Sequence, residues 1–132
     1  MHEDGKEHII QFACENWFVS DRNSVHFGEP AAYFIDAIED SVVVELSDAF
    51  LDQSARLNAA FRRFNELALQ NHIKHLQNRI ASLLGAPAKE RYNDFMALYP
   101  DLLNRVPQWM IASYLGITPE SLSRVRRELA RG

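Results

Sequence analysis

The chain has 132 residues, of which 47% are hydrophobic and 24% are charged, a composition typical of one soluble globular domain or two small ones. Its single cysteine, Cys14, excludes a disulfide framework and an iron–sulfur cluster held by several thiolates of this chain, which fits a reducing cytoplasm. No apolar run approaches the roughly 20 residues needed to span a bilayer, and residues 1–7 are too polar for a signal peptide.

Residues 1–46 have the pattern of strands joined by turns. Asp4-Gly5 is a hairpin turn signal, and Phe27-Gly28-Glu29-Pro30 is typical of a loop. Extended apolar runs predict strands at residues 8–13, 33–38 and 41–46. We therefore expect an α+β protein whose strands precede its helices.

Helices are predicted from residue 47 onward. Ser47-Asp48 is an N-cap signal for a short helix reaching about Gln53, and a second helix is expected over residues 55–84, about 45 Å long. Its apolar residues recur in steps of three and four, most clearly at Leu69, Ile73, Leu76, Ile80 and Leu83. A helix of this length usually needs a partner, which could be its own domain, a second copy of the chain, or both. We expect a homodimer in which the apolar stripe is shared between the strand layer and the partner's helix.

The sharpest domain boundary is the break at Gly85-Ala86-Pro87, which separates residues 1–84 from residues 85–132. A helix is predicted from Pro87 to about Tyr99, with Tyr92, Phe95, Met96 and Tyr99 on one face. Residues 101–105 are expected to form a short helical turn that leads into the final pair of helices.

The last 26 residues have the pattern of a helix-turn-helix. Pro107 suits a first helical position, and Gly116 suits the left-handed residue that ends a helix. Thr118 is an N-cap signal, and Pro119 fits the first turn of a second helix over residues 118–131. In DNA-binding proteins this second helix enters the major groove. The alternative is an ordinary helical hairpin at the chain end.

The charge is unevenly distributed. Residues 1–54 hold 12 acidic and 2 basic side chains, a net charge of −10, whereas residues 55–132 hold 12 basic and 6 acidic ones, a net charge of +6. Four arginines lie in the final predicted helix: Arg124, Arg126, Arg127 and Arg131. A local basic surface is what binds phosphate, so double-stranded DNA is the expected partner; a solvated helix face is the alternative.

The order of these elements resembles the Crp/Fnr family of bacterial transcription regulators, and a Bacteroidetes-type branch in particular. The resemblance is most specific in Ala88-Lys89-Glu90-Arg91-Tyr92, Tyr99-Pro100, Arg105-Val106-Pro107-Gln108 and residues 111–124. It implies a cyclic-nucleotide-binding-like β-roll, a long dimerisation helix and a winged-helix-like DNA-binding domain. Only part of the β-roll is expected here, because the first strands of the family pattern are absent. Three explanations are open: the chain is a fragment, its reading frame starts too late, or the protein has a reduced sensor.

The resemblance also assigns residue roles. It places Pro119, Glu120 and Arg124 against bases. A glutamate can accept a hydrogen bond from the amino group of cytosine, and an arginine can donate two hydrogen bonds to guanine. We expect phosphate contacts from Gln108, Ser121, Ser123 and Arg127. In relatives that bind cyclic nucleotides, a Gly-Glu pair is followed by an arginine that neutralises the phosphate. Gly28-Glu29 matches the pair, but no arginine lies between Arg22 and Arg56, so we expect no usual cyclic AMP response; a plain exposed turn is the alternative.

The remaining candidate sites are weaker. His72 and His75 lie one helical turn apart, but no third metal ligand is evident, and no basic neighbour activates Cys14. Neither a catalytic activity nor a cofactor is implied. Two rival functions remain open: a protein-interaction module built on the long helix, and a sensor for an unidentified small-molecule effector.

Overall fold

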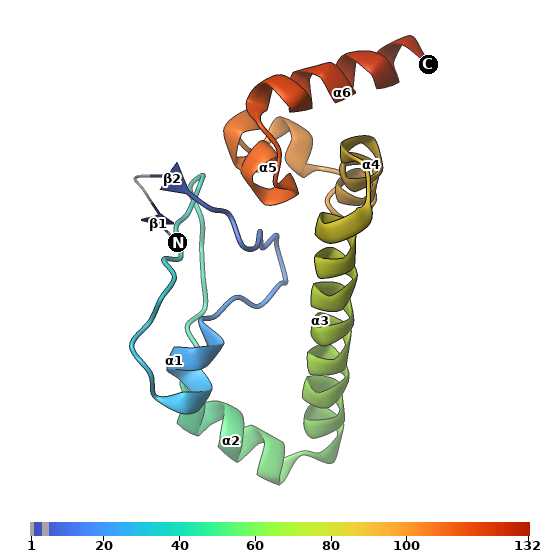
Figure 1. The fold of residues 1–132 in the computed structure, drawn as a ribbon. Coiled ribbons are helices and arrows are strands. Elements are labelled where there is room, and N and C mark those ends of the chain that lie inside the picture. The colour runs from blue at the N-terminus through green and yellow to red at the C-terminus, as the bar shows by residue number, and fades with distance from the viewer. Residues whose placement is uncertain (1, 4–5) are drawn as a thin grey trace. The chain divides into compact units, whose positions relative to one another are not determined.

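The structure is a computed structural model that describes residues 2–3 and 6–132 and is mostly helical (Figure 1). The helices, in chain order, are α1 (Arg22–Phe27), α2 (Asp48–Leu57), α3 (Ala59–Gly85), α4 (Ala88–Leu98), the 3-10 turn η1 (Leu102–Asn104), α5 (Gln108–Leu115) and α6 (Pro119–Arg131). Two compact units divide the chain: residues 37–81 form one, and residues 1–36 together with 82–132 form the other.

The expected α+β fold with a partial β-roll is wrong. The described strands are β1 (His2–Glu3) and β2 (Lys6–Glu7), an antiparallel pair in which His2 faces Glu7. The expected turn at Asp4-Gly5 lies outside the described residues. Within residues 6–132 none of the predicted strands at 8–13, 33–38 and 41–46 forms, and no strand accompanies α5 and α6, so the winged-helix expectation is wrong as well.

A missing sheet has a plain physical cause. A strand is stabilised by hydrogen bonds to a neighbouring strand, and residues 33–38 and 41–46 pair with no other segment among the described residues. All their side chains except the half-buried Leu46 are exposed, Phe34 and Val42–Val44 among them. Residues 8–13 instead remain extended and pack on helices, where Phe12 is buried.

The unit of residues 37–81 contains α2 and most of α3. The side chain of Ser47 caps α2 by accepting a hydrogen bond from the amide of Phe50, as its sequence signal predicts, but α2 continues to Leu57 rather than ending near Gln53. Asn58 separates the two helices, and its side-chain oxygen accepts hydrogen bonds from the amides of Ala60 and Phe61. The long helix therefore begins at Ala59, four residues later than predicted.

The other unit has its core between α4, α5 and α6. Tyr92 and Phe95 of α4, Ile111, Ala112, Tyr114 and Leu115 of α5, and Leu122 and Val125 of α6 are buried. Tyr92, Phe95 and Tyr99 lie on the face predicted for the helix after Pro87, and Leu102 and Val106 complete the core between the helices. This core fixes the pair α5–α6 on α4.

Asp21 organises the irregular segment that includes α1. One of its carboxylate oxygens caps α1 by accepting from the amides of Asn23 and Ser24, and the other accepts from the amides of Ala32 and Tyr33. Burial raises the pKa of Asp21, but these four hydrogen bonds outweigh it and hold the pKa below its usual value. Asp21 thus closes residues 21–33 into a loop.

Candidate nucleic-acid interface

The turn between α5 and α6 is built around Gly116. Its φ of 68° is left-handed, and its amide donates hydrogen bonds to the carbonyl oxygens of Ala112 and Ser113. The amide of Ile117 also donates to the carbonyl oxygen of Ala112. A Cβ on Gly116 would lie 3.2 Å from Cδ2 of Leu83 and 3.5 Å from Nη1 of Arg91. Both the backbone conformation and the tight contact with Leu83 therefore favour glycine here.

Thr118 begins α6 as its sequence signal predicts. Its Oγ1 accepts a 3.1 Å hydrogen bond from the amide of Ser121 and donates to the Ser121 hydroxyl, and Pro119 lies in the first helical turn. The following helix turns Leu122 and Val125 into the core. This spacing leaves Arg124, Arg127 and Arg131 exposed on the outer side of α6.

A side-chain contact ties the outer parts of the two helices together. Nη1 of Arg126 donates a 2.7 Å hydrogen bond to Oε1 of Gln108, at the first residue of α5. Ala112 of α5 is 1% exposed and belongs to the buried core beneath this contact. The Arg126–Gln108 contact joins residues 18 positions apart, so no local pattern could have predicted it.

Most of the residues expected to contact DNA lie on one exposed surface. The exposed ones are Pro119, Glu120, Ser123, Arg124 and Arg127. Ser121 is half-buried, because its hydroxyl takes part in the cap of α6. Gln108 is exposed, and its side-chain oxygen Oε1 accepts a hydrogen bond from Arg126. The amide nitrogen of Gln108 is the end that could donate to a phosphate.

The expected ligand loop has another role in the structure. Gly28, with a φ of 67°, caps the C-terminus of the six-residue helix α1, and the amide of Glu29 donates to the carbonyl oxygen of Asn23. The side chain of Glu29 is exposed. The amides of Ala32 and Tyr33 bind Asp21, so these donors are already used within the loop.

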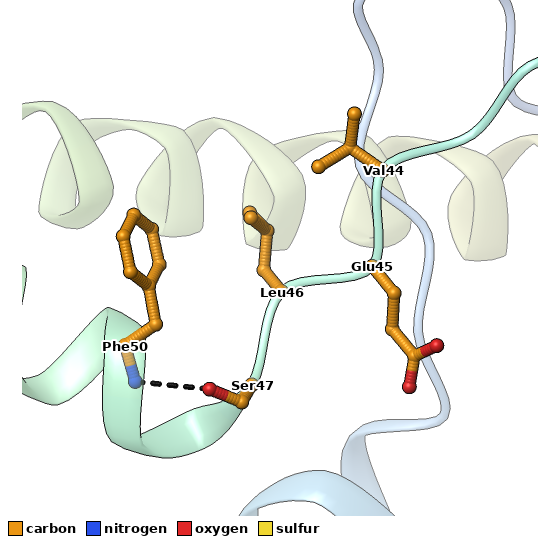
Figure 2. Close-up of a pocket in the computed structure, with 5 residues that line it drawn as sticks. All are labelled: Val44, Glu45, Leu46, Ser47 and Phe50. Atoms are coloured by element: carbon orange, nitrogen blue, oxygen red, sulfur yellow. Dashed lines mark hydrogen bonds between the residues drawn. The ribbon is translucent and has the colours of Figure 1, made fainter.

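A shallow pocket lies at the start of α2 (Figure 2). Leu46 and Phe50 project to the same side, whereas the carboxylate of Glu45 points to the other (Figure 2). Ser47 bonds the amide of Phe50, so its oxygen serves the helix cap. Glu45 is the charged residue of this lining, and because its carboxylate points away from Leu46 and Phe50 it is not placed to orient a small molecule beside them (Figure 2).

No helix in the described part of the chain combines the length and the apolar character needed to cross a membrane. In comparisons with known proteins, no protein-family model, no curated protein and no solved structure matches the chain. The interface must therefore be judged on its own geometry and chemistry.

Proposed function

We propose that the chain is a DNA-binding transcription regulator that places α6 in the major groove, in keeping with its resemblance to Crp/Fnr regulators. The observation that carries the proposal is the geometry from Gly116 to Arg131. The left-handed Gly116 and the N-cap Thr118 fix where α6 begins, and the apolar face of α6 packs in the core. Arg124, Arg127 and Arg131 remain exposed on the other side. A rigid helix with an outward guanidinium row suits both base and phosphate recognition.

The exposed side chains divide by chemistry. At the start of α6, Glu120 can accept from the amino group of cytosine, and Arg124 can donate two hydrogen bonds to guanine, with Pro119 beside them. Gln108, Ser121, Ser123 and Arg127 are donors suited to phosphates. Phosphate contacts supply affinity without sequence preference, whereas base contacts supply specificity.

A homodimer through α3 completes the proposal. No residue of α3 is buried among the described residues, yet Leu69, Ile73, Leu76, Ile80 and Leu83 recur along one side and are 36–57% exposed. Pairing two such stripes would remove this apolar surface from water. Two copies of α6 about 34 Å apart would then recognise a pseudo-palindromic site in successive major grooves.

The test is selection of duplexes from a random DNA pool, followed by titration of the selected duplex and single-base variants. Arg124→Ala should lose preference at one base pair, worth about 1–3 kcal/mol, whereas Arg127→Ala should weaken binding to all duplexes alike. Lys89→Ala, an exposed change on α4, is the control. If the wild-type protein selects no duplex, the result favours a protein-interaction module, in which the exposed apolar stripe of α3 would bind the partner.

The proposed regulator works in the cytoplasm without a cofactor. We expect it to show no usual cyclic AMP response, because the loop at Gly28 and Glu29 has no arginine in its sequence to neutralise a cyclic phosphate. Saturable binding of cyclic AMP at low micromolar concentration would contradict this expectation.

A further inference from the structure

Residues 7–15, which we call the docked segment, lie against α4 and α5, and α5 is the first helix of the candidate interface. We infer that the docked segment is a positioning element for DNA binding, because it holds α5 against α4 and so couples its own docking to the affinity of α6 for DNA. This inference rests on the proposed function. It is based on a set of contacts between parts of the chain that lie 87 to 106 residues apart.

Ser113 of α5 holds the first part of the docked segment. Its hydroxyl oxygen accepts a 3.0 Å hydrogen bond from the amide of Ile9 and donates a 3.3 Å bond to the carbonyl oxygen of Glu7. One side chain in α5 therefore meets both a donor and an acceptor of the extended backbone. Ile9 is half-buried against the core.

Phe12 fixes the middle of the docked segment. It is 6% exposed, and its ring centroid lies 6.1 Å from that of Phe95, 5.9 Å from that of Tyr99 and 5.4 Å from that of Tyr114. The hydroxyl of Tyr99 also donates to the carbonyl oxygen of Phe12. Phe95 belongs to α4 and Tyr114 to α5, so Phe12 fills the space where the two helices meet.

Glu15 anchors the end of the docked segment. Both of its carboxylate oxygens accept from the guanidinium of Arg105, at 2.7 and 3.3 Å. Arg105 lies between η1 and α5, three residues before the first residue of α5. The segment is thus attached at Ser113, in the aromatic cluster and at Arg105.

The location of these contacts indicates that docking of the segment strengthens DNA binding and does not block it. They come from α4, from the connection around Tyr99 and Arg105, and from α5, while Arg124 and Arg127 of α6 remain exposed. The docked segment therefore supports the helix pair from a side that leaves the arginine row open to DNA. Coupling between two binding events is reciprocal, so bound DNA should also strengthen docking of the segment.

The experiment compares Phe12→Ala with Phe18→Ala, a matched change at a side chain that is 62% exposed. Titrations use the selected duplex and the full chain, at a temperature where circular dichroism shows each variant folded. Phe12→Ala should lower DNA affinity about tenfold, within the range of ordinary coupling, and Phe18→Ala should leave it unchanged. Ser113→Ala, which removes two hydrogen bonds and keeps a good helix former, should lower affinity about fivefold in the same direction.

Hydrogen exchange provides a readout that does not require a variant to fold. In the wild-type protein, adding the duplex should slow exchange of the Ile9 amide, which is bonded to Ser113. Unchanged affinity in Ser113→Ala and Phe12→Ala, or an Ile9 exchange rate that does not respond to DNA, would overturn the coupling. A wild-type protein that selects no duplex would instead refute the proposed function itself.

Discussion

The guanidinium of Arg91 in α4 donates a 2.9 Å hydrogen bond to the carbonyl oxygen of Leu115, the last residue of α5. Carbonyl groups at a helix end have no partner within the helix, and a positive charge there also interacts favourably with the helix dipole. Arg91 therefore ties α4 to the point where the chain turns at Gly116. This link joins the packing of the core to the geometry of the interface.

Replacing Arg91 should destabilise the helix pair. Arg91→Met keeps most of the side-chain length but leaves the Leu115 carbonyl without its donor, at a cost of about 1–3 kcal/mol in the free energy of unfolding. Urea denaturation followed by circular dichroism measures the change. Lys89→Met, an exposed change on the same helix, should stay within about 0.5 kcal/mol of the wild type. Equal stability of the two variants would mean that the Arg91 bond adds no net stability beyond the cost of burying the unbonded Nε of the same side chain.

Two glycines allow the backbone cost and the packing cost of a Cβ to be separated. Gly28 and Gly116 have nearly the same φ, 67° and 68°, but only Gly116 would bring a Cβ against Leu83 and Arg91. Gly28→Ala should cost about 1–2 kcal/mol for the left-handed conformation alone. Gly116→Ala should cost more than Gly28→Ala, because the side chain of Leu83 must also shift by a few tenths of an ångström. Chemical denaturation of both variants tests this difference, and a smaller loss for Gly116→Ala would contradict it.

The contact between Glu15 and Arg105 should make stability depend on pH. The hydrogen bond from Arg105, a backbone hydrogen bond and the charge of Arg105 lower the pKa of Glu15 from 4.5 to about 2. Because the folded-state pKa lies below the unfolded one, the stabilisation is complete above about pH 4.5 and is lost as the pH falls toward 2.

Melting temperatures measured from pH 2 to pH 7 test this dependence. The wild-type protein should melt above Glu15→Gln at neutral pH, and the gap should close as the pH approaches 2. Glu29→Gln, a change at an exposed carboxylate, is the control. A gap that stays constant over the whole range would show that the carboxylate charge does not contribute.

The proposed dimer depends on the apolar stripe of α3. Leu76→Glu places a charge in the middle of the stripe and should convert a dimer into a monomer, because burying an unpaired carboxylate is costly. Lys74→Glu changes a side chain on another face of the same helix and should leave the dimer intact. Size-exclusion chromatography with light scattering gives the mass of each variant. A wild-type protein that is monomeric at all concentrations would rule out this assembly.

Local signals in the sequence placed the helices at the end of the chain well. Gly116 ends α5 and Thr118 caps α6 as these signals predict, but Pro107 is the N-cap of α5 and not its first helical residue, which is Gln108. The same kind of signal at Asp21 and Gly28 begins and ends α1, a helix in a region where the sequence predicts only strands and turns.

The wrong strand predictions and the unpredicted packing of the docked segment both concern contacts between residues far apart in the sequence. Residues 41–46 have strong strand propensity, but propensity forms no strand without a partner, and the described residues supply none. The contacts of Phe12 with Tyr114, of Ile9 with Ser113 and of Glu15 with Arg105 join segments that share no local pattern. The packing of the docked segment on α5 could therefore not be predicted from residue spacing.

The most direct test of DNA binding is the dependence of affinity on salt concentration, measured by fluorescence anisotropy with a labelled duplex. For the wild-type protein, the logarithm of the binding constant should fall steeply and linearly with the logarithm of the salt concentration, because the arginines displace counterions from phosphates. The double variant Arg124→Ala, Arg127→Ala should bind more weakly and with a flatter slope. Wild-type binding that is absent or independent of salt, or a double variant that matches the wild type, would contradict the role assigned to α6.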